Sequence, residues 1–215
     1  MKSQVSYEHI AQYYLSHNPS GAEKEIWIVL HGYGQLAEFF LRKFNSCFSE
    51  ERLFVAPEAT NYNYLNGFSG RVGANWMTRH ERELAISNNQ RLLNSLIDTI
   101  CNEYEVLPKI NVLGFSQGAA TASRWCNQLK YPISKLVLWG GGFANDLQIE
   151  GLGDALKLSE VIVVLGDQDE FITTDSIQKQ EELILSLEVK VNNITYSGGH
   201  DLHTPTLEMI VLKKN

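Results

Sequence analysis

Short apolar runs alternate with longer segments of helical period along most of the chain. Five of these runs are rich in β-branched residues and almost free of polar ones: 26–30, 53–56, 110–113, 136–139 and 161–165. Such runs are typical of parallel strands whose two faces are both covered by helices. A more polar run at 9–15 predicts an antiparallel edge strand, and 191–196 predicts one more strand.

The segments between the runs carry apolar residues at helical spacing. Helices are predicted at 36–48, 79–103, 117–129 and 174–187. A last helix is expected to start at Thr204-Pro205, with Thr204 as its N-cap and the proline in the first turn. Thr78 and Glu81 have the spacing of a capping box before the second helix, and Thr173 or Thr174 is expected to cap the fourth. The alternation predicts an α/β fold, a doubly wound and mostly parallel sheet with helices on both faces.

Residues 59–77 follow neither period and are rich in glycine and aromatic residues. A loop of this length is usually functional or mobile, so we expect either an aromatic-stapled surface loop or one wall of a substrate site. Sheet and helices use most of the remaining sequence. We therefore expect residues 1–215 to form a single domain without a separate cap domain.

Composition narrows the possible partners. The 215 residues include 18 Lys and Arg against 25 Asp and Glu, a net charge of −7 without any basic block. This balance argues against nucleic acid as the main partner. No stretch approaches the roughly 18 apolar residues of a membrane span, so no integral membrane segment is expected.

Cysteine usage and the first residues bear on the compartment. Cys47, Cys101 and Cys126 are widely spaced and form no C-x-x-C pair, which predicts free thiols and a reducing compartment. The first residues lack the apolar run of a signal peptide. The sequence therefore predicts a cytoplasmic protein.

The sharpest chemical signal is Gly114-Phe115-Ser116-Gln117-Gly118, between a predicted strand and a predicted helix. G-x-S-x-G in this context places a serine on a strained turn that exposes its hydroxyl beside a helix N-terminus. Ser116 is the predicted nucleophile, and the alternative is a structural turn serine. A second G-F-S at Gly67-Phe68-Ser69 lacks both the fifth glycine and a preceding strand, so we interpret it as loop.

A serine nucleophile needs a base to take its proton. The histidines downstream of Ser116 are His200 and His203. His200 follows the last predicted strand in a glycine-rich turn and is the preferred base, with His203 interpreted as a capping or surface residue. The two could suggest a metal site, but no third ligand of matching spacing accompanies them.

The acid that orients the histidine should follow the strand at 161–165. Asp169 is preferred over Asp167, because the loop must run a few residues beyond the sheet before it reaches a histidine. Asp167 is expected to hydrogen-bond the turn backbone. Asp146 and Asp154 follow the preceding strand and are weaker candidates.

A second oxyanion donor is expected after the strand at 26–30, in His31-Gly32-Tyr33-Gly34-Gln35. Glycine-flanked backbone at this place can turn the Tyr33 N–H toward Ser116, and the Gln117 N–H supplies the other donor. We expect His31 to hold the loop by hydrogen bonds. The glycines lack the signature of a phosphate-binding loop, so no cofactor and no metal are expected.

These motifs resemble the carboxylesterase/phospholipase/acyl-protein thioesterase family of α/β-hydrolases. The resemblance runs in order from about residue 24 to the end of the sequence, and its most specific part is Gly-Phe-Ser-Gln-Gly. It implies the same triad of Ser116, Asp169 and His200, with Tyr33 and Gln117 as oxyanion donors.

The resemblance also bears on the substrate. Trp76 stands roughly where the family has a Trp-Phe-Asp segment lining the site, and Phe68, Trp139 and Phe171 are further candidates for substrate contact. The family usually has leucine at Tyr33, aspartate at Gln35 and proline at Glu170, so a different acyl-binding surface is expected.

The implied function is hydrolysis of small-molecule carboxylic esters through an acyl-enzyme intermediate. The same triad would also serve an acyl thioesterase or a serine peptidase. A non-catalytic α/β-hydrolase domain that only binds a ligand is the competing class. Oligomeric state stays open.

Overall fold

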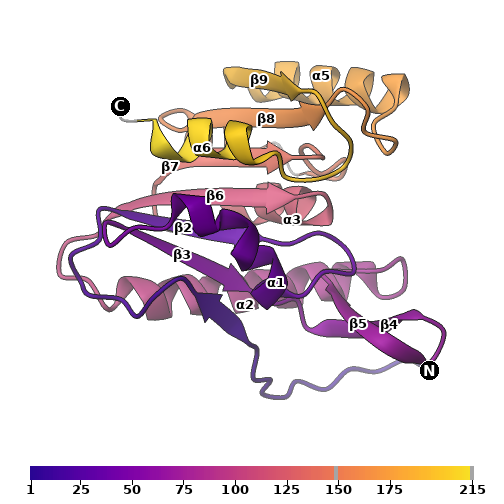
Figure 1. Cartoon of the computed structure of the whole chain (residues 1–215). Coiled ribbons are helices and arrows are strands. Elements are labelled where there is room, and N and C mark those ends of the chain that lie inside the picture. The colour runs from indigo at the N-terminus through magenta and orange to yellow at the C-terminus, as the bar shows by residue number, and fades with distance from the viewer. Residues whose placement is uncertain (148–149, 214–215) are drawn as a thin grey trace.

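The apolar runs form the strands of one large sheet (Figure 1). The computed structural model describes residues 1–147 and 150–213. The seven strands lie in the order β1-β3-β2-β6-β7-β8-β9. Their bounds are β1 Tyr13–Leu15, β2 Glu25–Leu30, β3 Arg52–Pro57, β6 Lys109–Phe115, β7 Ile133–Trp139, β8 Glu160–Gly166 and β9 Val191–Tyr196. All neighbours pair in parallel except β1 with β3, which confirms the predicted antiparallel edge strand.

Helices cover both faces of the sheet, as predicted. Their bounds are α1 Ala37–Leu41, η1 Arg42–Cys47, α2 Arg82–Cys101, α3 Gln117–Cys126, α4 Leu152–Leu156, α5 Thr174–Leu187 and α6 Thr204–Leu212. One apolar core joins the sheet to α1, the 3₁₀ helix η1 and α6, and the other joins it to α2, α3, α4 and the end of α5. Figure 1 shows these two layers in front of and behind the strands.

The central strands are mostly apolar because most of their side chains enter one of the two cores. In β2, Ile26 and Ile28 pack in the core with α2 and α3, whereas Trp27 and Val29 pack in the core with α1 and α6. Successive side chains of a strand point to opposite faces, so both sets are buried. The alternation of polar and apolar residues that marks a half-exposed strand is therefore absent from β2.

Residues 59–77 are not an irregular loop, and that prediction was wrong. They form an antiparallel hairpin of β4 Asn61–Asn66 and β5 Ser69–Asn75, outside the main sheet. Most of the hairpin is exposed, so it lacks the buried apolar positions that identified the other strands. The turn at Asn66-Gly67 was the available signal, because Asn-Gly favours tight hairpin turns.

The predicted helix starts were right in part. Thr173 caps α5 in a reciprocal capping box with Ser176. The capping box of Thr78 and Glu81 is absent: α2 starts at Arg82, and Glu81 has a left-handed backbone (φ 51°) and pairs with Lys2. The last helix has His203 rather than Thr204 as its N-cap residue.

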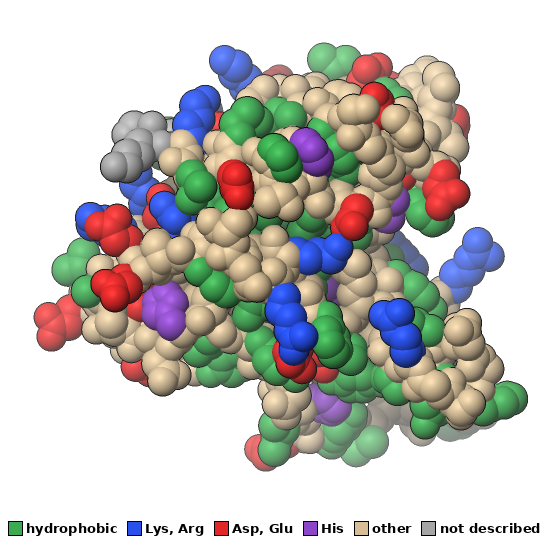
Figure 2. Space-filling view, in the orientation of Figure 1, with side chains coloured by type: hydrophobic (Ala, Val, Ile, Leu, Met, Phe, Trp, Pro, Cys, Tyr) green, Lys and Arg blue, Asp and Glu red, His purple; other side chains and the backbone are tan. Residues whose placement is uncertain are grey.

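Other features match expectations from the composition. The three cysteines are free and buried. On the described part of the face in Figure 2, lysines and arginines are interspersed with aspartates and glutamates. Within residues 1–147 and 150–213, no helix combines the length and the apolar character needed to cross a bilayer.

The start of α3 lies against the end of β2 in direct backbone contact. A Cβ atom on Gly118 would be 2.2 Å from the Leu30 carbonyl oxygen, and one on Gly114 would be 2.2 Å from the Gly118 carbonyl oxygen. Real Cβ atoms do not approach backbone oxygens this closely. Both glycines are therefore required by packing, and they bring the turn at Ser116 next to the loop that follows β2.

We expect Gly118→Ala to lower the free energy of unfolding by about 1–3 kcal/mol or more, because the added methyl group forces α3 away from β2. Urea denaturation followed by far-UV circular dichroism measures this change. Gly199→Ala is the matched control, since its Cβ would meet an ordinary neighbour at 3.7 Å. Equal losses in the two variants would contradict the packing argument.

Candidate active site

Ser116 lies at the sharp turn between β6 and α3. Its backbone is in the left-handed region (φ 54°, ψ −117°), and its N–H donates to the Trp139 carbonyl oxygen at 2.8 Å. A non-glycine residue is strained in this conformation and persists only where its surroundings impose it. The side chain is half-buried and lines a cavity of about 940 Å³.

Asp169 and His200 lie next to each other although 31 positions separate them in the sequence. The Asp169 carboxylate is 2.7 Å from Nδ1 of His200, and its side chain is fully buried. The other carboxylate oxygen accepts the Phe171 N–H at 3.0 Å. The His200 ring lies between Phe115 and Phe171, with ring centroids 4.9 and 4.7 Å away. The imidazole is thus held by one carboxylate and two aromatic rings, and it lines the same cavity as Ser116.

The alternative acids have other partners. Asp167 accepts the Gly198 N–H at 2.9 Å, the turn role that the sequence predicts. Asp146 pairs with Arg124 and Arg82, and Asp154 pairs with Lys157.

The alternative base also has other partners. Nδ1 of His203 lies 2.9 Å from the Thr206 hydroxyl, and its ring stacks on Tyr196 at 5.0 Å. His200 and His203 therefore have different hydrogen-bond partners.

Sequence reasoning missed the glycines that follow β7. Gly140 has a positive φ of 57°, and a Cβ there would lie 3.1 Å from the His200 ring. A Cβ on Gly141 would lie 3.0 Å from the Ser116 carbonyl oxygen. This backbone therefore lies against both the serine and the histidine, and the run Gly140-Gly141-Gly142 after a strand was the signal for it.

The loop after β2 carries Tyr33 between Gly32 and Gly34. The Gly32 N–H donates to the Gln35 side-chain oxygen at 2.8 Å, Gly34 N–H to the Ala74 carbonyl oxygen at 2.8 Å, and Gln35 N–H to the Gly32 carbonyl oxygen at 3.3 Å. Among the described residues, the Tyr33 N–H has no hydrogen-bond acceptor. Gln117 is the first residue of α3, so its N–H has no acceptor within the helix. These are the two donors that the sequence predicts for an oxyanion.

The Gln117 side chain, in contrast to its backbone N–H, has hydrogen-bond partners. Its carbonyl oxygen accepts the Trp76 N–H at 2.8 Å, and its amide donates to the Met77 carbonyl oxygen at 2.8 Å. The Trp76 indole donates to the His31 carbonyl oxygen at 2.8 Å. The end of β5 is thereby fastened to both α3 and the loop after β2.

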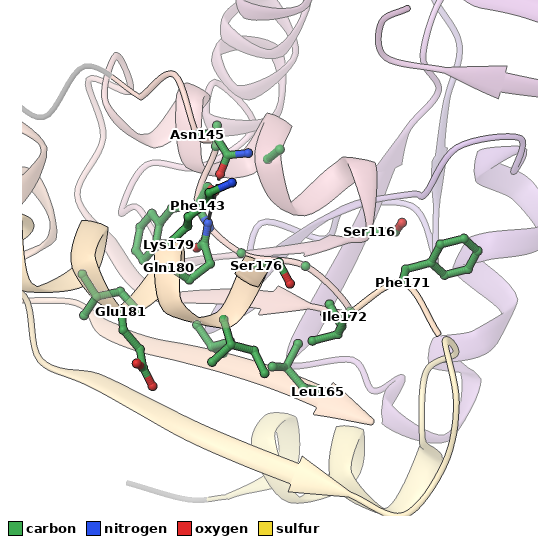
Figure 3. Close-up of a pocket in the computed structure, with 18 of the residues that line it drawn as sticks. Ser116, Phe143, Asn145, Leu165, Phe171, Ile172, Ser176, Lys179, Gln180 and Glu181 are labelled. Atoms are coloured by element: carbon green, nitrogen blue, oxygen red, sulfur yellow. Dashed lines mark hydrogen bonds between the residues drawn. The ribbon is translucent and has the colours of Figure 1, made fainter. Parts of the chain in front are cut away.

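A cavity of about 940 Å³ extends from Ser116 and His200 beneath α5 (Figure 3). Apolar side chains from β8, β9, α5 and the neighbouring loops line much of it, among them Val163, Leu165, Ile172, Ile184 and Ile194. Only Leu187 of α5 is buried, so this helix stands away from the sheet and leaves the space open. Gln180 binds both backbone groups of Phe143 at 2.8 Å and holds the facing loop.

The four residues predicted to contact substrate differ in position. Phe171 lines the cavity, whereas Phe68 is 97% exposed in the turn of the hairpin. Trp76 and Trp139 are fully buried, and neither lines the cavity. Their indole N–H groups bond backbone oxygens of His31 and Asp201, so we correct their expected role to structural support.

Comparison with protein-family models identifies the family of the chain. The family model described as phospholipase/carboxylesterase matches residues 14–212. The chain belongs to this family. No curated protein matches it significantly.

Solved structures of low sequence identity share the fold. Esterase PE8 is 21% identical, with a TM-score of 0.69 over 94% of this chain and 96% of that one. Acyl-protein thioesterase 2 of Zea mays is 16% identical, with a TM-score of 0.71 over 94% and 97%. A phospholipase/carboxylesterase from Dyadobacter fermentans is 21% identical, with a TM-score of 0.69 over 98% and 100%.

His31 is fully buried and supports the loop after β2. Its Nδ1 donates to the Gly32 carbonyl oxygen at 2.8 Å, and its Nε2 accepts the Ala59 N–H at 3.1 Å. Only the neutral ring can make both contacts, because Nε2 must be unprotonated to accept the Ala59 N–H. Burial lowers the pKa of His31 to about 4, against a smaller opposing effect of the Gly32 carbonyl.

The free energy of unfolding should therefore fall as the pH decreases from about 6.5 to about 4. In this window the unfolded chain protonates His31 and the folded chain does not, which amounts to a loss of about 3 kcal/mol. Urea denaturation across this range should show a shallower pH dependence for His31→Gln than for the wild type. His80→Gln, whose side chain is 90% exposed, is the control. The same slope in His31→Gln and the wild type would refute the assignment.

Proposed function

We propose that this chain is a serine hydrolase that cleaves small-molecule carboxylic esters through an acyl-enzyme intermediate. The observation that carries the proposal is the 2.7 Å pair of a buried Asp169 with His200, beside a strained Ser116 on the same cavity. Buried carboxylate, histidine and serine from three different loops form the usual constellation for nucleophilic acyl transfer.

His200 takes the proton of Ser116 as the serine oxygen attacks the ester carbonyl. The N–H groups of Tyr33 and Gln117 stabilise the oxyanion, and each such donor is typically worth ~10²–10³ in rate. His200 then protonates the leaving alcohol. A water, deprotonated by the same histidine, releases the acid and restores the serine, while Asp169 keeps the proton on Nδ1.

The cavity beneath α5 is the proposed acyl site. Its apolar side chains can take a hydrocarbon chain out of water at roughly 0.8 kcal/mol per buried CH₂. Phe171, at the His200 end, would contact the first carbons of the chain. The cytoplasmic location expected from the sequence stays a prediction.

A fluorophosphonate probe should label the wild type on Ser116, and p-nitrophenyl acetate should be hydrolysed. Ser116→Ala should abolish both the labelling and the hydrolysis, because the variant lacks the hydroxyl that attacks the probe and the ester. Ser69→Ala is the matched control, since it removes the serine of the other G-F-S motif. Peptide mass spectrometry locates the label, and absorbance at the nitrophenolate band follows hydrolysis.

An unlabelled and inactive wild type would reject the enzyme and favour the non-catalytic binding domain. Label on another serine would reject Ser116 as the nucleophile. Matched ester, thioester and peptide substrates then separate the remaining enzyme classes by kcat/KM. If the thioester or the peptide has a higher kcat/KM than the ester, the enzyme would be assigned to the thioesterases or the peptidases instead of the esterases.

Asp169→Asn should lower kcat by about four orders of magnitude, as loss of the acid does in other triads. The amide would favour the wrong tautomer of His200. Asp167→Asn keeps a side-chain oxygen that can accept the Gly198 N–H, so it should change kcat little. Steady-state kinetics on p-nitrophenyl acetate compares the two variants. A larger loss in Asp167→Asn would reverse the assignment.

A further inference from the structure

The cavity has a charged end that the proposed mechanism does not use. Arg82, at the start of α2, and Arg124, on α3, both line it, together with Asp146 from the loop after β7. Nε and one terminal nitrogen of Arg124 bind a single Asp146 oxygen at 3.1 and 2.6 Å. Arg82 binds the other oxygen at 2.5 Å. Two guanidinium groups thus share one carboxylate.

This end of the cavity lies in line with the nucleophile. Ser116, Ala120 and Arg124 all line the cavity at four-residue spacing, so they follow one face of α3. Each helical residue advances about 1.5 Å, which puts Arg124 about 12 Å along the axis from Ser116. Ala120 between them has a small side chain. A substrate extended along this face would therefore reach from the serine to the arginines.

At this end of the cavity, two arginines face a single lining carboxylate, that of Asp146. Partial burial raises the pKa of Asp146, but hydrogen bonds from Arg124 and Arg82 outweigh it and lower the pKa to about 2, so this carboxylate is ionised. Two positive charges face one negative charge, and the side chain of Arg124 is only 10% exposed. The second partner of Arg82, Glu83, is 81% exposed and does not line the cavity.

The other charged groups of the cavity belong to α5. Asp175 and Lys179 pair with each other at 2.8 Å. Figure 3 shows the Glu181 carboxylate at the far end of the view from Ser116. The surplus positive charge therefore lies at the end formed by α2, α3 and the loop after β7.

We propose that Arg82 and Arg124 bind a carboxylate carried by the substrate, which makes the substrate an anionic ester rather than a simple fatty acyl ester. The inference rests on the proposed esterase function. A guanidinium pair suits a carboxylate because each presents parallel N–H donors to its two oxygens. A bound carboxylate would complete a cluster of two positive and two negative charges in a partly desolvated site.

Two ester series distinguish which side of the substrate carries the anion. Monomethyl esters of dicarboxylic acids carry it on the acyl side, and acetoxy derivatives of straight-chain ω-hydroxy acids carry it on the alcohol side. Neutral methyl alkanoates and alkyl acetates of the same length are the references. Hydrolysis is followed by pH-stat at low ionic strength. The measured quantity is the kcat/KM ratio of anionic to neutral ester at each length.

We expect this ratio to exceed one in one of the two series and to peak at an intermediate length. Arg124→Gln and Arg82→Gln should each lower the peak ratio by about 10–100-fold, the usual effect of losing one charge-assisted hydrogen bond. Asp146→Asn should raise it, because the competing carboxylate is gone. A purely structural ion cluster would not give opposite effects in these variants. Arg91→Gln, also on α2 but outside this cavity, is the control.

A ratio at or below one in both series would overturn the inference while leaving the esterase intact. A ratio above one that Arg124→Gln and Arg82→Gln leave unchanged would also overturn it, since the preference would come from elsewhere. A wild type that hydrolyses neither the anionic nor the neutral esters would reject the proposed function itself.

Discussion

The backbone contact between the start of α3 and the end of β2 is the constraint on which the rest of the site depends. Gly118 lies so close to the Leu30 carbonyl that no side chain fits between them. This contact brings the turn at Ser116 and the loop at Tyr33 together, although more than 80 residues separate them. The two proposed oxyanion donors come from these two segments, so their separation is set by glycine packing rather than by any side chain of the site. The strain at Ser116 is sustained by the same packing.

The hairpin of β4 and β5 extends this constraint beyond the sheet. A Cβ on Gly73 would lie 2.3 Å from the Gly34 carbonyl oxygen, and Ala74 exchanges backbone hydrogen bonds with the loop after β2. Gln117 and Trp76 close the connection to α3 through side chains. The hairpin thus braces the loop that carries Tyr33 from the side away from the sheet. Its exposed turn contributes nothing to this support.

The cavity combines two kinds of wall. Beneath α5 it is largely apolar, because this helix buries little of its surface and stands away from β8 and β9. Beside α2 and α3 it is charged, because Arg82 and Arg124 converge on Asp146. Ser116 and His200 line the same cavity as both walls. The fold common to the family therefore leaves room for substrates of different polarity, and the side chains of this chain decide between them.

The sequence by itself determined the sheet, the order of its layers and the motif residues near the site. Strands buried on both faces are apolar throughout, and the catalytic motifs follow strands whose ends meet at one edge. Tertiary structure alone decided the rest. Trp76, Trp139 and Phe68 are equally aromatic in sequence, yet two are buried supports and one is exposed in a turn. The hairpin at 61–75 is mostly exposed, so it lacks the buried apolar positions that mark the other strands. The cluster of Arg82, Arg124 and Asp146 joins segments far apart in the chain, and local periodicity carries no information about such a pairing.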